Sequence, residues 1–461
     1  MSRHSSGADH NRDEAARAAK EAADDVYTAL FDRALEHQID PTLDRVREVC
    51  EMLGDPQLGY QVIHVTGTNG KTSTSRMIER LLREHGLRTG RFTSPHLTRV
   101  TERIAIDGEP ISDERFVEVW QDVAPYVHLV DRKHLEAGGY RLSFFEVLAV
   151  MAFAAFADAP IDVAVVEVGM GGRWDATNVV HSQVQVIAPV AMDHQRYLGD
   201  TLAEIAGVKA GIIEEGGTVV VSLQDEVAEG VILAEAAAKG ARVVREDVDI
   251  AVVERSPAVG GQLLTLRGLG GVYADVFLPM FGAHQAHNAL LALASSEALL
   301  TGGAALDGGV VEAAFADMSS PGRLEVVRSS PTVVVDGAHN PSGMEALVAA
   351  LDESFTFERI VGVVAIMSDK DPDAMLGLLE PVLDEVVVTH ASTSRSMDVD
   401  ELAEIAEDVF GPDRVHRAER LDDAIALAVE RAESEVERGG GVVVTGSLYL
   451  VAEARILLGR P

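Results

Sequence analysis

The chain has 461 residues, of which 47% are hydrophobic, and this length predicts two globular domains because it exceeds what one hydrophobic core usually holds. Its 74 acidic against 39 basic residues give a formal net charge of −35, which argues against nucleic acid or an anionic membrane as a partner, since both would be repelled. The single cysteine, Cys50, leaves no disulfide framework and no thiolate metal site.

The excess of carboxylates predicts a protein adapted to a high-salt cytoplasm, where screening shortens the range of self-repulsion. The alternative is an acidic enzyme from an ordinary bacterial-type cytoplasm, and an unfolding curve at low salt would distinguish the two. Residues 1–25 are polar and charged without an apolar signal core, and no run is long enough to span a membrane. We therefore expect a cytoplasmic protein that begins with a flexible tail or a solvated helix.

Apolar periodicity predicts an α/β fold. Leu43, Val46, Val49 and Leu53 recur at helical spacing and indicate a short amphipathic helix. Apolar strands then alternate with helical stretches, at residues 61–66, 88–93, 162–168, 184–189 and 218–222. This alternation is typical of a large, mostly parallel sheet whose strands are joined by helices.

The pattern changes after residue 248. Three short β-rich runs between residues 249 and 278 are separated by Gly-Gly pairs, which predicts a small antiparallel patch. Helices at residues 284–300 and 308–318 follow, and Ser-Ser-Pro-Gly at residues 319–322 reads as a linker.

A second series of strands alternates with helices beyond the linker and predicts a smaller, Rossmann-like α/β domain. These strands are expected at residues 324–327, 332–336, 359–365, 385–389 and 441–445. We divide the chain into a tail (1–25), a large domain (26–318), a linker (319–323) and a C-terminal domain (324–461).

Residues 62–74 predict a phosphate-binding loop. An apolar strand ends in a glycine loop that runs directly into a helix, with Lys71 at the turn. Gly67 and Gly70 allow successive amide groups to face an anion, and the helix N-terminus and Lys71 add positive charge. The usual Walker pattern has a glycine where this chain has Val65, so a glycine-rich turn without a ligand is the alternative.

Polar residues follow the next strands. Ser94 comes after the second strand, where its hydroxyl could reach a metal held near the phosphates. Glu167 ends an apolar strand and opens into a glycine-rich segment at residues 169–178, which suggests a metal-bound carboxylate and a backbone close to a ligand. Asp193-His194 repeats this arrangement one strand later. A carboxylate satisfied by neighbouring amides and a core histidine are the alternatives.

Together these segments resemble the folylpolyglutamate synthase and dihydrofolate synthase family of the Mur ligase superfamily. The resemblance runs from about residue 40 to the C-terminus, and its motifs occur in the family's order. They are Gly67-Thr68-Asn69-Gly70-Lys71, Ser94-Pro95-His96-Leu97, Glu102-Arg103-Ile104, Phe145-Glu146-Val147, Glu167-Val168-Gly169, Gly172-Arg173, Asp175-Ala176-Thr177-Asn178, Asp193-His194, Lys209-Ala210-Gly211-Ile212, His284-Gln285, Pro321-Gly322-Arg323, Asp336-Gly337-Ala338-His339-Asn340-Pro341, Asp369-Lys370-Asp371 and Thr445-Gly446-Ser447-Leu448-Tyr449.

The resemblance implies an ATP-dependent amide ligase with an ATP-binding central domain and a C-terminal glutamate ligase domain. ATP would phosphorylate a folate-type carboxylate, from dihydropteroate or a reduced folate, and the amino group of L-glutamate would attack the acyl phosphate. By analogy Ser94, Glu167 and His194 would bind a first Mg²⁺. Lys209 would be carbamylated to N6-carboxylysine and bind a second Mg²⁺, whereas an unmodified, surface-reaching lysine is the alternative.

The resemblance also assigns the remaining site residues. Those for ATP are Gly67, Thr68, Asn69, Gly70, Lys71, Thr72, Asn288, Arg323 and Asp336. His339 and Ser447 would bind glutamate, and Lys71, Lys209 and His339 would be catalytic. The folate pocket would contain Ser143, Phe144, Phe145, Glu146, Trp174, Asp175 and Ala176, although ordinary core packing is the alternative for the two phenylalanines.

Three sites depart from the family pattern. Thr72 stands where the folate enzymes more often have glycine, and Trp174 stands where leucine is usual. Gln195-Arg196 follows His194 where a threonine is common. The first departure resembles the peptidoglycan ligases, so a Mur-type ligase for a cell-wall or other precursor is the rival function. Against it, the segment before Gly67 is too short for the nucleotide-sugar domain of those enzymes. A noncatalytic nucleotide-binding homologue is the third possibility, and we expect a monomer.

Overall fold

The computed structural model describes residues 5–33, 41–434 and 439–460, and the side chains of residues 5–13 are outside the description. Contacts divide the chain into two units. Unit 1 comprises Met1–Ala251, Gly268–Gly271 and Leu291–Val311, and unit 2 comprises Val252–Arg267, Val272–Leu290 and Glu312–Pro461. The predicted linker, residues 319–323, lies within unit 2. The predicted domain boundaries stay a prediction. None of the described helices is long and apolar enough to cross a membrane.

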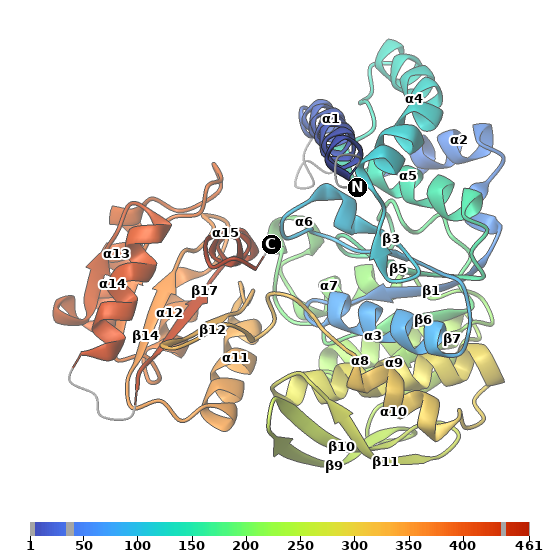
Figure 1. The fold of residues 1–461 in the computed structure, drawn as a ribbon. Coiled ribbons are helices and arrows are strands. Elements are labelled where there is room, and N and C mark those ends of the chain that lie inside the picture. Colours follow the sequence, from blue (N-terminus) through green and yellow to red (C-terminus); the bar gives the residue numbers. More distant parts are fainter. Residues whose placement is uncertain (1–4, 34–40, 435–438, 461) are drawn as a thin grey trace. The chain divides into compact units, whose positions relative to one another are not determined.

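Unit 1 is built on an eight-stranded sheet with the order β4-β3-β2-β5-β1-β6-β7-β8 (Figure 1). Its six parallel strands are β1 (Gln61–Thr66), β2 (Thr89–Phe92), β5 (Val163–Glu167), β6 (Val184–Ile187), β7 (Thr218–Val221) and β8 (Arg242–Arg245). Strands β3 (Ile104–Ile106) and β4 (Glu109–Pro110) add an antiparallel edge. The five predicted strands are present, whereas β3, β4 and β8 escaped prediction because they are short or begin and end with polar residues.

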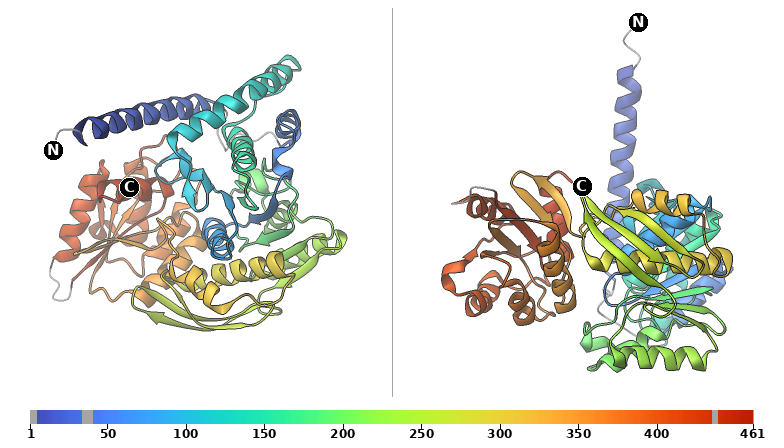
Figure 2. Two further views of the ribbon diagram at one scale, coloured as in Figure 1. Left: turned by 45° about the vertical axis from the view of Figure 1, so that its right-hand side comes forward. Right: turned by 90° about the horizontal axis from the view of Figure 1, so that it is seen from below.

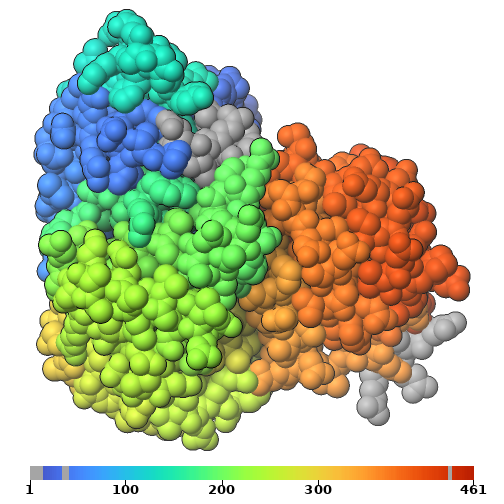
Figure 3. All heavy atoms as spheres, turned by 180° about the vertical axis from the view of Figure 1, so that it is seen from behind, coloured from blue at the N-terminus to red at the C-terminus, as the bar shows by residue number. Residues whose placement is uncertain are grey.

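Helices cover this sheet because each presents an apolar side to it. Helix α3 (Lys71–Glu84) packs on β1, β2 and β5. Helix α5 (Phe144–Asp158) is apolar around nearly its whole circumference, since it is enclosed by the sheet and by α2 (Asp44–Met52) and α4 (Asp113–Glu136). Helices α7 (Leu202–Ala210) and α8 (Glu226–Ala238) pack together, and the segment that contains α8 reaches the surface in Figure 3 (yellow-green).

The amino-terminal segment forms helix α1 (Ser5–Phe31), which lies along α4 (Figure 2). Ala23 and Leu30 of this helix are buried in the main core of unit 1. Of the two predicted alternatives, a tail or a solvated helix, the described residues therefore adopt the helix, and its last two turns belong to the core.

A buried ion pair joins α3 to the sheet. Glu79 accepts a 2.7 Å contact from Arg91 of β2, and the two side chains are only 2% and 3% exposed. Glu79 also accepts a hydrogen bond from the backbone nitrogen of Gly108, so one carboxylate connects α3, β2 and the β3–β4 turn.

Glu79→Ala should lower the free energy of unfolding by about 3–5 kcal/mol, because Arg91 would keep a buried charge without its counter-ion. Urea unfolding at constant salt measures this loss. Glu84→Ala is the matched control, since Glu84 pairs with Arg80 at a more exposed site of the same helix and should lose no more than about 1 kcal/mol. Equal losses in the two variants would contradict the prediction.

Unit 2 contains two sheets. The predicted antiparallel patch is a separate three-stranded sheet of β9 (Ala251–Ala258), β10 (Gly261–Arg267) and β11 (Val272–Leu278). The second sheet has the order β12-β13-β17-β14-β15-β16, formed by Glu325–Ser329, Thr332–Val335, Gly441–Thr445, Ile360–Val364, Glu385–Val388 and Val415–Arg417. All of its strand pairs are parallel except β12 with β13. Only the three-residue β16 was not predicted.

Helices connect the strands of unit 2. They are α11 (Pro341–Ser354), α12 (Pro372–Leu379), α13 (Val399–Phe410), α14 (Leu421–Glu433) and α15 (Leu448–Leu457). The predicted helices before them are α9 (Ala283–Thr301) and α10 (Gly308–Ala316). The carboxyl ends of β13, β14 and β17 therefore meet at one edge of the sheet, which is where ligands bind in open α/β sheets.

Candidate active site

The predicted phosphate loop has the conformation that its glycines permit. Gly67 and Gly70 both have positive φ angles, +149° and +83°, and a Cβ atom on Gly67 would lie 2.7 Å from the Cβ of Ala188. The Nζ atom of Lys71 donates to the carbonyl oxygens of Gly67 and Thr68, at 3.1 Å each. The ammonium group is thus held at the loop that would enclose a phosphate.

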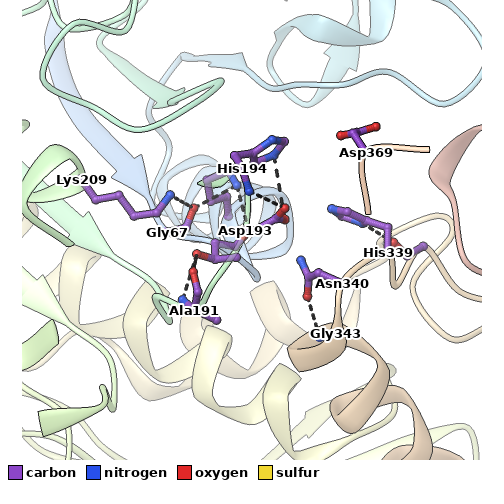
Figure 4. A network of polar contacts seen from close by, with 12 residues as sticks. Gly67, Ala191, Asp193, His194, Lys209, His339, Asn340, Gly343 and Asp369 are labelled. Atoms are coloured by element: carbon purple, nitrogen blue, oxygen red, sulfur yellow. Dashed lines mark hydrogen bonds and ion pairs between the residues drawn. The ribbon is translucent and has the colours of Figure 1, made fainter. Parts of the chain in front are cut away.

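The segment after β6 is hydrogen-bonded to this loop. The backbone nitrogen of Thr68 donates to Pro189 O at 2.8 Å, and the Thr68 hydroxyl accepts from Ala191 N at 3.0 Å and donates to Ala191 O at 3.1 Å. Two residues later Asp193 accepts from the backbone nitrogen of His194, which has a positive φ of 52°. These contacts hold Asp193 and His194 beside the phosphate loop, as Figure 4 shows.

Glu167 is buried at the carboxyl end of β5 and contacts the first turn of α3. The Thr72 hydroxyl lies 2.9 Å and 3.0 Å from the two carboxylate oxygens. Ser94 follows β2, which pairs in parallel with β5, so Ser94 and Glu167 come from the carboxyl ends of adjacent strands. The predicted Mg²⁺ ligands therefore surround the phosphate loop on both sides of β1.

Lys209 lies at the end of α7 with only 4% of its surface exposed, and its Nζ donates to Gly67 O at 2.8 Å. Burial, reinforced by the nearby Lys71 ammonium, lowers the pKa of Lys209 to about 7, while Asp193 and Asp175 act in the opposite direction. Figure 4 shows its side chain extending toward Gly67. With a pKa of about 7, a substantial fraction of the amine is neutral near physiological pH, and the neutral form is the one that carbamylation requires.

The donor set of this site fits a hard divalent cation. A buried carboxylate, hydroxyls and one imidazole stand around a loop suited to a triphosphate, and oxygen ligands are those that Mg²⁺ prefers. Among the residues that the structure describes, no group of three or more His, Cys, Asp or Glu side chains could hold a metal without other ligands. Phosphate oxygens, hydroxyls or a modified lysine would have to complete the coordination.

The glycine-rich segment after β5 packs closely against neighbouring helices, and its approach to a ligand stays a prediction. A Cβ on Gly169 would lie 2.5 Å from the ring of Phe145, and one on Gly172 would lie 2.9 Å from the carbonyl oxygen of Lys209. Gly169 thus lets the ring of Phe145 in α5 approach the segment after β5, and Gly172 lets the end of α7, where Lys209 lies, approach the same segment.

The predicted folate residues fall into two environments. Ser143 and Glu146 form the capping box of α5, and Glu146 also receives a buried 3.0 Å ion pair from Arg45 of α2. Phe144 and Phe145 belong to the main core cluster, as does Ala176, whereas Trp174 packs against the cluster around α7 and α8. Their binding role stays a prediction, and the observed contacts of Glu146 are structural.

Sequence patterns missed a buried network of hydrogen bonds that joins β1 to the segment after β5. The Thr177 hydroxyl donates to Asp175 at 2.5 Å, and it therefore accepts from Nε2 of His64 in β1 at 2.9 Å. Asp175 also accepts from the backbone nitrogen of Met170. Burial raises the pKa of Asp175 to about 6 and lowers that of His64 to about 3. The motif that contains Asp175 and Thr177 was recognised, whereas its contact with His64 was signalled only by a polar residue within an apolar strand.

Acid should weaken the fold through His64. Its folded-state pKa of about 3 lies below the ordinary value of 6.5, so the unfolded chain binds a proton that the folded chain does not. The resulting stability is present above pH 6.5 and is lost as the pH falls toward 3, at about 1.4 kcal/mol per pH unit. His64→Gln should flatten the dependence of the free energy of unfolding on pH, measured by urea titrations at about pH 6 and 5.

The raised pKa of Asp175 acts with the opposite sign, because the folded chain then binds the extra proton between about pH 6 and 3.8. The test therefore compares two slopes of the free energy of unfolding against pH, one for His64→Gln and one for the unmodified chain. A substitution of the exposed His181 serves as the control. Identical slopes for the His64 variant and the unmodified chain would contradict the prediction.

Unit 2 contains several of the residues that are predicted to bind the nucleotide. Asp336, at the end of β13, accepts from the backbone nitrogens of Leu324 and Ala338, and burial raises its pKa while Arg323 opposes that rise. Burial lowers the pKa of His284, in the first turn of α9, to about 4, and Arg323 contributes to the shift. Asn288, also in α9, is buried and donates to Gln285.

The two residues predicted to bind the substrate L-glutamate follow neighbouring strands of unit 2. His339 follows β13 and donates from Nδ1 to Gly337 O at 2.7 Å, because a carbonyl oxygen can only accept. Ser447 follows β17, and its hydroxyl caps α15 by accepting from Tyr449 N. Gly446 N donates to Ala338 O, which joins the two loops. Figure 4 shows His339 beside Asn340, the residue that caps α11.

Known proteins are similar to this chain along nearly its whole length. Residues 116–296 match the Mur ligase middle domain, and residues 322–448 match the Mur ligase glutamate ligase domain. A dihydrofolate synthase/folylpolyglutamate synthase of Mycobacterium tuberculosis is 50% identical over 455 residues, which cover 94% of this chain and 93% of that protein. The chain belongs to the dihydrofolate synthase/folylpolyglutamate synthase family.

Solved structures agree with this family assignment. A Mycobacterium tuberculosis folylpolyglutamate synthase complexed with ADP has a TM-score of 0.92 at 50% identity and covers 96% of this chain and 99% of its own. A folylpolyglutamate synthase complex with AMPPCP and folate has a TM-score of 0.77 at 32% identity, and the match covers 91% of this chain and 96% of that one. The predicted α/β fold class and the resemblance to the dihydrofolate synthase/folylpolyglutamate synthase family are thereby confirmed.

Proposed function

We propose that this chain is an ATP-dependent ligase that joins the amino group of L-glutamate to the carboxylate of dihydropteroate or a reduced folate. ATP would phosphorylate that carboxylate, and the amine would then displace phosphate from the acyl phosphate. Membership of the dihydrofolate synthase/folylpolyglutamate synthase family supports the reaction class. The structural observation that carries the proposal is the set of hydrogen bonds that joins Glu167, Lys209 and the segment before His194 to the phosphate loop.

The phosphate loop residues 67–72 would bind the triphosphate of ATP. The amino terminus of α3 would face the anion, and Lys71 would leave the Gly67 and Thr68 carbonyls for the terminal phosphate. Ser94, Glu167 and His194 would hold a first Mg²⁺, and Lys209, as N6-carboxylysine, would help to hold a second. When bound, Mg²⁺ neutralises charge on the phosphoryl oxygens.

The remaining residues would orient the substrates. Asn288, Arg323 and Asp336 would contact the nucleotide, and a guanidinium suits phosphate because its donors match two oxygens. His339 would bind the ammonium or amine of glutamate, with Ser447 on the adjacent loop. The folate-side residues 143–146 and 174–176 would receive the acceptor, and the protein would act as a monomer.

A panel of acceptors with purified protein in molar salt tests this function. We expect glutamate-dependent release of ADP with dihydropteroate, with tetrahydrofolate monoglutamate, or with both. The pattern distinguishes dihydrofolate synthase from folylpolyglutamate synthase activity. Release of ADP only with UDP-linked cell-wall precursors, or with no acceptor although ATP binds, would overturn the proposal.

A further inference from the structure

The carboxyl end of α1 forms an aromatic cluster with the first residue of α5. The rings of Tyr27 and Phe31 lie 5.9 Å and 5.8 Å from the ring of Phe144, both nearly perpendicular to it. The Tyr27 ring also meets the His96 ring edge-on at 5.7 Å. The guanidinium carbon of Arg103 stands 5.2 Å from the centre of the Phe144 ring. We call Tyr27, Phe31, His96 and Phe144 the α1 cluster.

The cluster has a buried base and an open side. Phe144 is only 2% exposed, so its neighbours enclose it, whereas Phe31 is 43% exposed and therefore retains open ring surface. Tyr27 and His96 are half-buried. A planar ligand can therefore reach Phe31, His96 and Tyr27, but it cannot stack on Phe144 in this arrangement.

His96 adds a directed polar group to the open side. Its Nδ1 accepts a 2.9 Å hydrogen bond from Nε of Arg103, so the neutral ring carries its proton on Nε2. An N–H donor beside two aromatic rings suits a flat heterocycle with acceptor nitrogens, because the rings supply stacking area and the donor fixes orientation.

The end of α1 is held in place by contacts to the segment before α5. Arg33 donates to Leu142 O at 3.0 Å and pairs with Asp131 at 2.9 Å. Arg141 donates to Asp32 O at 2.6 Å. With Leu30 buried in the core, the helix end is fixed to the residues that lead into Ser143.

We propose that the α1 cluster is a wall of the acceptor site, in which Tyr27, Phe31 and His96 contact the flat ring system of the folate-type acceptor. This inference rests on the proposed function and adds residues of the amino-terminal helix to its substrate site. Two neighbours support it: His96 belongs to the loop that contains Ser94, and Phe144 directly follows Ser143, one of the predicted folate residues. The cluster thus joins the predicted metal side of the site to its folate side.

Phe31→Ala tests the wall directly, because the exposed ring can be removed with little effect on the core. We expect the KM for dihydropteroate or the reduced folate, and the dissociation constant from a fluorescence titration with dihydropteroate, to rise by about fivefold, the worth of one typical aromatic contact. The KM values for ATP and glutamate should not change. Phe31→Trp, which keeps a flat ring, should restore acceptor affinity. Tyr126→Ala on α4, outside the cluster, is the aromatic control.

The outcomes separate this inference from the proposed function. If the unmodified chain turns over a folate-type acceptor but Phe31→Ala leaves its KM and dissociation constant unchanged, the wall is disproved and the function stands. Equal rises in all three KM values, or a fall in the melting temperature that matches the loss of activity, would indicate a structural role and also overturn it. If the unmodified chain binds no such acceptor, the proposed function itself fails.

Discussion

Lys71→Ala should reduce glutamate-dependent ADP release by about a hundred- to a thousandfold in kcat, the effect of removing one preorganised group that stabilises developing charge. The structure places the Lys71 ammonium at the phosphate loop. Lys71 is the first residue of α3, and its Nζ already lies within 3.1 Å of two loop carbonyls, where the terminal phosphates would bind. Steady-state kinetics with saturating ATP and acceptor measure the loss.

The matched control is Lys133→Ala. Lys133 is exposed on α4 and pairs with Glu48, away from the phosphate loop, so its loss removes the same charge without touching the site. We expect kcat within about twofold of the unmodified chain, as for most surface substitutions. Thermal unfolding of both variants shows whether the loop change affects folding. Unchanged ADP release by Lys71→Ala would rule out the proposed phosphate site.

The elements of this site were predictable because their signals are local. Five apolar strands of unit 1 appear where the sequence places them, and β5 ends at Glu167 as expected. In a parallel sheet the carboxyl ends of the strands lie at one edge, so the strands predict that Ser94, Glu167 and the phosphate loop lie along that edge, whereas the adjacency of β2, β5 and β1 is seen only in the structure. The three-stranded antiparallel sheet was predictable for the same reason, since its Gly-Gly turns lie between its own strands.

The partners of individual side chains were not predictable, because they come from distant parts of the chain. Glu146 looks like a ligand residue in its motif, yet its ion-pair partner Arg45 lies 101 residues earlier. The Thr72 hydroxyl meets Glu167 across 95 residues, and Thr177 meets His64 across 113. Sequence patterns identify the residue types at strand ends, whereas tertiary packing decides which of these side chains already have partners within the protein.

The amino-terminal helix shows the same limit. Its polar composition gave no amphipathic signal strong enough to predict packing, and the apolar residues near its end were too few to form a recognisable stripe. Their significance depends on Phe144 and His96, which the fold brings to them. A segment that the sequence assigns to a tail or solvated helix thus contributes aromatic rings next to the predicted acceptor residues.

Lys209 is the second residue whose replacement should nearly abolish activity. In the proposed site its amine attacks CO₂, forms an N–C bond and releases one proton, which gives a carbamate with two oxygen ligands. The nitrogen keeps one N–H that can still donate to Gly67 O, the contact seen at 2.8 Å. Lys209→Gln keeps an N–H donor on a side chain one bond shorter but cannot form the carbamate. We expect kcat to fall by about a hundredfold or more, as for a lost contact to a catalytic metal.

A spectroscopic measurement separates the carbamate from the alternative of an unmodified lysine. Incubation with ¹³C-bicarbonate should give a carbamate signal in the ¹³C spectrum of the unmodified chain, and activity should fall when CO₂ is removed. The signal should be missing from Lys209→Gln and present in Lys71→Ala, a variant that loses the neighbouring lysine instead. No other described lysine combines burial with a pKa lowered to about 7, so the modification should be confined to this position. Full activity without CO₂, together with no carbamate signal, would show that Lys209 acts as an unmodified amine.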